Sequence, residues 1–303
     1  MGLGMAALGA GDKGLGAESK EAMPTVKLGS HTVSRLILGS NPILGYSHVS
    51  GLMSRLMTDY FTLERIQHLL LRCRQLGINT WQTSASDKVD KSLATLRGDG
   101  ADMQWVFLAS GRHLEDVELL KATIAQNKPI AIVHHGGVSD RLWREGKIEK
   151  AHDFAKRVQD LGVLAGISAH NPDVIRNAED KGWNLDLYMA CFYEVTRTGD
   201  QVRKLLGDVP LGELFLPGDP ARMCEVVRAV KRPCLGFKIL AASRRAERPE
   251  HVASAFEFAF EHIKPTDAVI VGMFPRFTDQ AGENAALTRR FGTPARIPHQ
   301  GGA

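Results

Sequence analysis

Two adjacent histidines, His134 and His135, could carry acid–base or metal chemistry. They directly follow Pro129–Val133, a short apolar segment rich in β-branched residues that is typical of a buried strand, and two glycines come next. An imidazole changes its charge near neutral pH and is also a common metal ligand. A single histidine after a strand can equally be structural, so the role of this pair depends on the elements around it.

Polar side chains also follow the other strands that we expect. Five of the eleven histidines lie at such positions: His48, His113, His134, His135 and His170. Further polar residues at these strand ends are Gln82, Tyr193, Glu194 and Lys238. If the strands are parallel, their carboxyl ends meet at one edge, and these groups form one site.

One chemistry that this set supports needs no metal. His134 or His135 acts as a base near neutral pH, and Lys238 or Arg112 stabilises the negative charge of an enolate-like intermediate. Gln82 and Tyr193 complete the candidate catalytic set. Proton abstraction next to a carbonyl, leading to isomerisation or elimination of a sugar-like substrate, needs only these parts.

The other chemistry uses a divalent metal ion. His134 and His170, with His48 or Glu194, supply the imidazole and carboxylate ligands that Zn²⁺ or Mn²⁺ accepts. Such an ion would polarise a carbonyl or hydroxyl group. The sequence contains no H-x-x-H or H-E-x-x-H motif, whose spacing would favour a metal site.

The elements that would position these residues alternate as strand, turn and helix. Strands are expected at 35–38, 78–83, 105–109, 129–133, 163–168, 185–192, 234–240 and 267–273, after a hairpin at 25–33. Helices are expected at 62–76, 88–96, 114–126, 148–161, 171–181, 220–230, 249–263 and 278–291. Residues 43–60 are expected as a long loop and 196–216 as an irregular insertion. Strict alternation predicts a closed (β/α)8 barrel, and no G-x-G-x-x-G follows the first strand.

Composition restricts the class of protein. The chain has 303 residues and a net charge of +4 without a basic block, so we expect a small-molecule substrate and no nucleic-acid partner. Four separated cysteines indicate reduced thiols in a cytoplasmic compartment. No run of 18 apolar residues occurs, so no membrane span is expected. We expect a disordered leader at 1–23, one barrel domain at 24–292 and a loose tail at 293–303; oligomerisation is left open.

The chain resembles aldo-keto reductases over residues 25–291. Lys27–Gly39 is similar to the opening hairpin and first strand of that family, and Gly77–Thr83 to its second strand. Lys147–Ser168 resembles its fourth helix and fifth strand, and Ile270–Met273 and Glu283–Leu287 resemble its last strand and helix. The resemblance implies a TIM barrel with an N-terminal β-hairpin.

The family's catalytic positions are mostly altered. Its aspartate falls at Gln82, its lysine at about Gly111, and no tyrosine occurs between Thr83 and Leu96. Only His134 matches. The implied NADP(H) contacts are Ser168, Arg244, Arg245, Glu283 and Asn284, whereas the family's glutamine and ring-stacking aromatic fall near Ala190 and Lys238.

Three functions remain open. The first is a non-redox isomerase or lyase that abstracts a proton from a small sugar-like or carbonyl substrate. The second is an NAD(P)H-dependent aldo-keto reductase with altered acid–base residues. The third is a catalytically inactive binding barrel. If His134 is the base, replacing it with alanine removes activity and leaves the melting temperature nearly unchanged.

Overall fold

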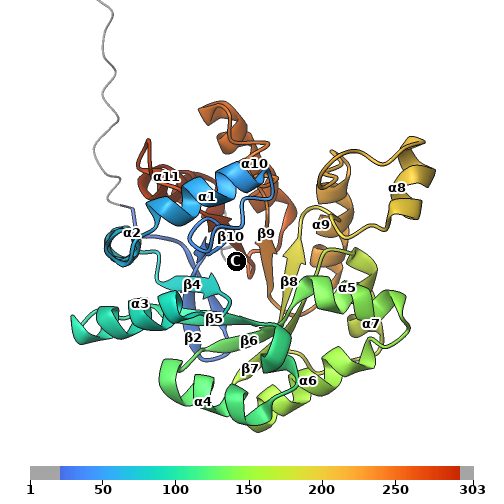
Figure 1. Cartoon of the computed structure of the whole chain (residues 1–303), viewed down its shortest axis with the longest axis horizontal. Helices are drawn as coiled ribbons and strands as arrows, with labels where there is room; N and C mark the ends of the chain where they lie inside the picture. Colours follow the sequence, from blue (N-terminus) through green and yellow to red (C-terminus); the bar gives the residue numbers. More distant parts are fainter. Residues whose placement is uncertain (1–20, 294–303) are drawn as a thin grey trace, which may run out of the picture.

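Eight apolar segments form parallel strands whose hydrogen bonds close into a barrel. The computed structural model describes residues 21–293. The barrel strands are β3 (Leu36–Gly39), β4 (Thr80–Thr83), β5 (Gln104–Ala109), β6 (Ala131–His134), β7 (Leu164–Ala169), β8 (Leu187–Cys191), β9 (Cys234–Phe237) and β10 (Ala268–Gly272). They follow one another around the barrel in chain order, and β10 pairs with β3 to close it. The fold is therefore a (β/α)8 TIM barrel, with the helices surrounding the strands (Figure 1).

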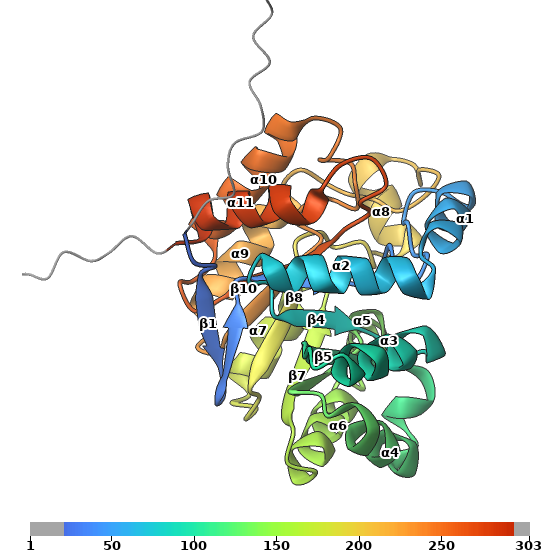
Figure 2. The same cartoon turned by 90° about the vertical axis from the view of Figure 1, so that its left-hand side faces the viewer.

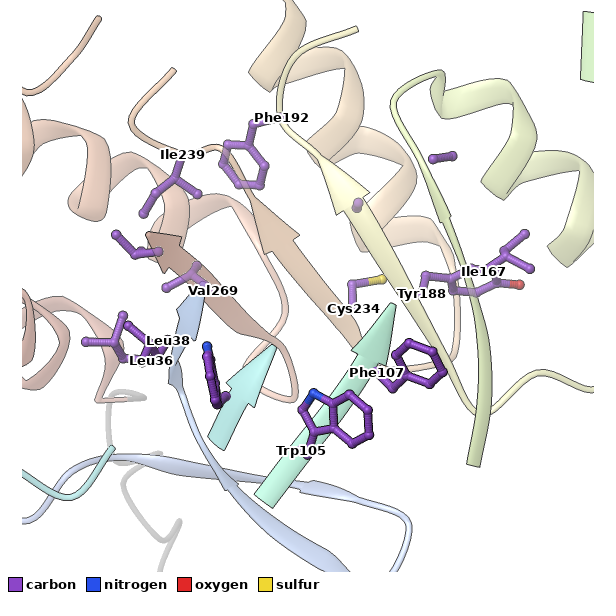
Figure 3. Close-up of a cluster of buried hydrophobic side chains, with 14 of the residues drawn as sticks. Leu36, Leu38, Trp105, Phe107, Ile167, Tyr188, Phe192, Cys234, Ile239 and Val269 are labelled. Carbon is purple, nitrogen blue, oxygen red and sulfur yellow. The ribbon is translucent and has the colours of Figure 1, made fainter. Parts of the chain in front are cut away.

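The strands are buried on both faces, which explains their continuous apolar composition. Alternate residues face the barrel axis, where a compact cluster includes Ile37, Val106, Val133, Leu187 and Ile270. The residues between them face the helices in a larger cluster. Figure 3 shows members of this outer layer, among them Leu36, Trp105, Phe107, Tyr188 and Val269.

An antiparallel hairpin seals one end of the barrel. Strands β1 (Thr25–Leu28) and β2 (His31–Ser34) pair in register, with Val26 opposite Val33, and Gly29 takes a positive φ of 56° in the turn. Both valines pack into the inner cluster. Figure 2 shows the hairpin at one end and helices α1 and α8 at the other. That opposite end, where the carboxyl ends of the strands lie, is called the barrel mouth below.

The helices cover the outer face of the strands. They are α1 (Gly51–Tyr60), α2 (Leu63–Gln75), α3 (Asp87–Gly98), α4 (Val117–Asn127), α5 (Gly136–Arg144), α6 (Glu149–Asp160), α7 (Pro172–Asp180), α8 (Gly199–Leu206), α9 (Asp219–Ala229), α10 (Pro249–His262) and α11 (Gln280–Gly292), with a 3₁₀ turn, η1, at Gly111–Leu114. Several helices begin with an N-cap side chain that accepts a backbone hydrogen bond. Thr62, for example, accepts one from the N–H of Arg65. The eight helices expected from apolar periodicity are confirmed within a few residues at each end.

Three helices were not expected. Helix α1 lies within the expected loop at 43–60. Its apolar residues Leu52, Leu56 and Tyr60 recur at helical spacing although none of them is buried, so the expectation of a loop was wrong there. Helix α8 lies in the expected irregular insertion. Helix α5 begins at two glycines and buries Ser139 and Asp140 beside Leu142, and these polar residues hide its amphipathic pattern.

The ends of the chain differ in part from the expectation. Most of the expected leader, residues 1–20, and most of the tail, residues 294–303, lie outside the described residues. Met23, however, is buried in the outer cluster, and its side chain lies against Gly77, so the leader cannot extend to residue 23. Within residues 21–293, no helix has the length and apolar character that a membrane crossing requires.

Candidate active site at the barrel mouth

His134 and His135 face opposite sides of the sheet because β6 alternates. Val133 belongs to the inner cluster, so His134 faces the helices. Its Nδ1 lies 2.8 Å from Ser139 Oγ, its ring packs edge-on against Phe154, and it is 2% exposed. Burial, with smaller contributions from nearby positive groups, lowers the pKa of His134 to about 4. The expectation that His134 lies at the mouth is therefore wrong.

His135 takes the position at the mouth instead. It caps α5, and its Nδ1 accepts the backbone N–H of Gly137 at 3.2 Å. With Nδ1 as acceptor, the proton of the neutral ring is on Nε2, which is then a donor. Burial lowers the pKa of His135, and the charges of His170 and Lys238 lower it further, which keeps the ring neutral near pH 7.

The central pair of the mouth is His170 with Asp140. His170 Nδ1 lies 2.8 Å from Asp140 Oδ2, and Asp140 is 1% exposed. The same carboxylate accepts the backbone N–H groups of His170 and Asn171 and, at 2.9 Å, the hydroxyl of Thr196. Asp140 therefore acts as a hydrogen-bond acceptor toward all of these groups. His170 must then carry its proton on Nδ1 and leave the Nε2 lone pair unoccupied.

Local packing orients the His170 ring. It lies 5.5 Å from the Phe237 ring in an edge-to-face arrangement. On the other side, a Cβ added at Gly136 would lie 3.1 Å from His170 Cε1 and 2.9 Å from Ser168 Oγ. Only glycine allows the start of α5 to approach the imidazole this closely.

A third imidazole, that of His48, connects three segments across the mouth. His48 Nδ1 lies 2.8 Å from Glu213 Oε1, and its Nε2 lies 3.0 Å from Asn41 Nδ2 and 3.2 Å from Lys238 Nζ. Burial raises the pKa of Glu213, but the His48 hydrogen bond and the charges of His48, Lys238 and Arg244 outweigh it and hold that pKa below its ordinary value. Glu213 therefore stays ionised opposite His48.

Gln82 lies in the wall of the barrel near the mouth. Its neighbours in the sheet are Gly39 on β3 and Val106 on β5, and Trp81 beside it faces the helices. Gln82 is 7% exposed, and no residue within 21–293 forms a hydrogen bond with its side chain. The amide is therefore free to bind a polar ligand.

Tyr193 and the two arginines interact with other parts of the protein. Tyr193 packs against Phe215 and forms a hydrogen bond with Arg245, and burial raises the pKa of its hydroxyl. Arg244 stacks on Phe215 at 4.0 Å and donates to the carbonyl of His48 at 3.2 Å. These contacts give the three side chains a role in holding the loops of the mouth together.

The residues suggested for NADP(H) each have partners within the protein. Ser168 is buried beneath Gly136, and Arg245 also donates to Ser254. Asn284 is buried on α11, and Glu283 accepts a hydrogen bond from Thr278. Arg244 and Arg245 each contact another group of the protein and are exposed.

Each of the four suggested metal ligands also has another partner in the protein. His134 contacts Ser139, His170 contacts Asp140, and His48 contacts Glu213. Glu194 forms ion pairs with Arg197 at 3.0 Å and Arg222 at 3.1 Å. In the part of the chain that the structure describes, no group of three His, Cys, Asp or Glu side chains is arranged to hold an ion.

Sequence reasoning missed Asp140, Thr196 and Glu213. Asp140 lies in a helix without a recognisable pattern, and the other two lie in the insertion expected to be irregular. The only hint in the sequence was an aspartate five residues after a histidine pair, at the start of an unassigned segment. That spacing alone does not indicate contact with His170.

Cys191 is buried at the end of β8, and burial raises the pKa of its thiol to about 12. It is therefore a core residue, because a reactive cysteine needs a lowered pKa.

Comparisons with known proteins agree on the fold alone. No family model and no curated protein matches the chain. The solved structures that resemble it include Gox0644 in its apo form, at 12% identity and a TM-score of 0.50 over 93% of this chain and 97% of that one. The glycerol dehydrogenase AKR11B4 from Gluconobacter oxydans resembles it at 10% identity and 0.46, over 92% and 99%. Dihydropteroate synthase from Xanthomonas albilineans does so at 13% and 0.45, over 88% and 96%. The likeness to Gox0644 shows a shared fold and nothing more.

Proposed function

We propose that this protein is a non-redox enzyme that abstracts a proton next to the carbonyl group of a small polar substrate, as isomerases and lyases do. The observation that carries the proposal is the buried Asp140–His170 pair at the barrel mouth. A base oriented by a carboxylate, with its second nitrogen free, is the arrangement that proton abstraction requires.

The imidazoles of His170 and His135 have complementary roles. His170 presents a lone pair on Nε2 because its Nδ1–H donates to Asp140. His135 presents an Nε2–H because its Nδ1 accepts from Gly137. One ring can take a proton from carbon while the other donates a hydrogen bond to the carbonyl oxygen.

Positive charge near the reacting carbonyl comes from Lys238. It lies next to Phe237, which packs on His170, and its charge is felt at His135. A cation at this place stabilises the electron-rich intermediate that proton loss creates. A divalent metal and NADP(H) stay predictions of the sequence, for which the side-chain positions supply no support.

Hydrogen exchange tests this proposal. The protein is incubated in D₂O with dihydroxyacetone, glyceraldehyde or pyruvate, and deuterium at the carbon next to the carbonyl is followed by NMR. His170→Asn and Asp140→Asn should slow the exchange by about 10²–10⁴-fold, the usual contribution of a positioned base. His134→Gln, which changes the neighbouring imidazole that faces the helices, should leave the rate unchanged.

Two results would contradict the proposal. One is exchange in the wild type no faster than in buffer with all three compounds. The other is a His170→Asn variant as fast as the wild type. Quenching of NADPH fluorescence by the protein, together with either result, would favour the reductase alternative.

A further inference from the structure

Lys238 interacts with the Glu213 carboxylate only through its charge and not in a direct ion pair. In the described part of the chain no Asp or Glu oxygen forms an ion pair with its ammonium group, and its near contacts are His48 Nε2 at 3.2 Å and the Phe237 ring at 5.6 Å. The Lys238 ammonium group is therefore held next to a base, the imidazole of His48. A nucleophilic lysine needs such a base, because only the unprotonated amine is a nucleophile.

His48 is arranged to accept the proton of Lys238. Its Nε2 faces the amide nitrogen of Asn41 and the ammonium of Lys238, and both are donors. Nε2 must then be the acceptor, and Nδ1–H donates to Glu213 at 2.8 Å. Glu213 thereby fixes the tautomer in which the free lone pair of His48 is directed at Lys238.

His48 and Lys238 both have a left-handed backbone conformation at the point where they meet. His48 has φ 57° and Lys238 has φ 59°, a region that residues other than glycine seldom adopt. Arg244 donates to the carbonyl of His48 and so holds this loop beside the segment that follows β9. Strained residues in direct contact at the mouth of a barrel are consistent with a functional constraint.

In this arrangement Glu213 orients the base, His48 is the base and Lys238 is the nucleophile. We propose that Lys238 is a covalent catalyst that forms a Schiff base with the carbonyl carbon of the substrate. This inference rests on the proposed function, since it specifies how that site activates its carbonyl substrate.

The chemistry balances without a further reagent. The ammonium of Lys238 passes one proton to His48 Nε2, and the amine lone pair forms a bond to the carbonyl carbon while the π pair moves to oxygen. The oxygen takes that proton and a second one from the nitrogen, and leaves as water when the C–O bond breaks. Ammonium and carbonyl therefore give a protonated imine and water, and no electrons are exchanged with an oxidant or reductant.

The imine then serves the proton abstraction assigned to His170. Loss of the proton from the neighbouring carbon sends its electron pair toward the positive nitrogen, giving a neutral enamine. Reprotonation at another carbon, or loss of a leaving group, followed by addition of water, releases the product and Lys238. The substrate class is accordingly a small aldehyde or ketone with a hydrogen on the adjacent carbon.

The first experiment needs no knowledge of the substrate. The intact protein is treated with pentane-2,4-dione, which forms a stable enaminone with a nucleophilic lysine, and the modified residue is found by peptide mass mapping. Lys88 is the internal control, because it is also half-buried but donates to the carbonyl of Phe61 and has no imidazole partner. Lys238 should react at least about tenfold faster than Lys88, and His48→Asn should remove that difference.

The second experiment traps the imine. Borohydride is added to the protein with pyruvate or dihydroxyacetone, and the reduced adduct should appear on Lys238 in the wild type and be absent in Lys238→Arg, with circular dichroism to check that the variant is folded. Labelling of Lys238 no faster than that of Lys88, or unchanged by His48→Asn, would overturn the inference.

The variants separate this inference from the proposed function. His170→Asn should lose deuterium exchange and keep fast labelling of Lys238. Deuterium exchange at the wild-type rate in Lys238→Arg would refute the Schiff base and leave proton abstraction by His170 standing. Fast labelling of Lys238 in a wild type that shows no exchange would refute the proposed function alone.

Discussion

His134 contributes to stability through contacts with the helix layer. Its ring is enclosed by Phe154 and bonded to Ser139 Oγ at 2.8 Å. Replacing it with alanine should lower the free energy of unfolding by about 2–3 kcal/mol, from a cavity and a lost hydrogen bond, without changing the exchange rate at the mouth. Urea denaturation and the deuterium assay measure the two effects. A variant that loses activity but keeps its stability would show that His134 is catalytic.

The pH dependence of stability should also depend on His134. Its pKa of about 4 in the folded chain lies below the ordinary value of 6.5. As the pH falls from about 6.5 toward 4, His134 binds a proton in the unfolded chain but not in the folded chain. The free energy of unfolding therefore decreases. His134→Gln should flatten this dependence, measured by urea denaturation at several pH values. Equal slopes for both proteins would contradict the assignment.

Gly136 matters because it leaves room for the catalytic base. An alanine Cβ at this position would come within 3.1 Å of His170 Cε1. Gly136→Ala should shift the ring and slow deuterium exchange by about tenfold or more, since a base misplaced by a fraction of an ångström loses rate. Gly98→Ala is the control, because a Cβ there meets nothing within 4 Å. The same rate in both variants would mean that the His170 ring tolerates displacement.

At the scale of elements, an ion-pair cluster holds the insertion between β8 and α9. Arg197 donates to Asp219 Oδ2 at 2.8 Å and to the carbonyl of Glu194 at 2.9 Å, and Asp219 also accepts the N–H of Glu194. The cluster joins the two ends of the segment that carries Glu213. We conclude that it positions Glu213 beside His48.

Removing Arg197 tests this connection. Arg197→Met leaves the buried Asp219 carboxylate without its main partner and should cost about 3–5 kcal/mol of stability. It should also speed proteolysis between Thr198 and Leu216 and slow the labelling of Lys238. Arg203→Met is the matched control, because Arg203 pairs with Asp200 on the exposed face of α8 and should have no measurable effect. Unchanged proteolysis in Arg197→Met would show that the insertion is held by other contacts.

At the scale of the whole molecule, closure of the barrel protects the thiols. Cys73, Cys191, Cys224 and Cys234 are unpaired and buried, and burial raises the pKa of each. The folded protein should therefore react with a thiol reagent such as dithionitrobenzoate only as fast as it unfolds, whereas the unfolded chain should react at all four residues. One rapidly reacting cysteine under native conditions would contradict the burial described for the barrel.

The sequence by itself determined the barrel. The apolar runs of the strands, the spacing of helices such as 62–76 and 249–263, and the hairpin at 25–33 are each set by residues close together in the chain, and all are confirmed. Helix α1 was not expected although its apolar residues have helical spacing, helix α8 has only 8 residues, and helix α5 buries polar residues that hide its pattern. The sequence also indicated that histidines such as His135 and His170 lie at the carboxyl ends of the strands, because parallel strands share one direction, but His113 and His134 contact the helix layer instead.

Only the tertiary structure decided the site. Asp140 and His170 are 30 residues apart, and His48 lies 165 residues from Glu213 and 190 from Lys238. No local pattern records such contacts, since they depend on how separate loops meet above the strands. The sequence could not show which of His134 and His135 faces the barrel mouth. The pairing of the strands decides this, because a shift of one residue along a strand turns a side chain to the opposite face.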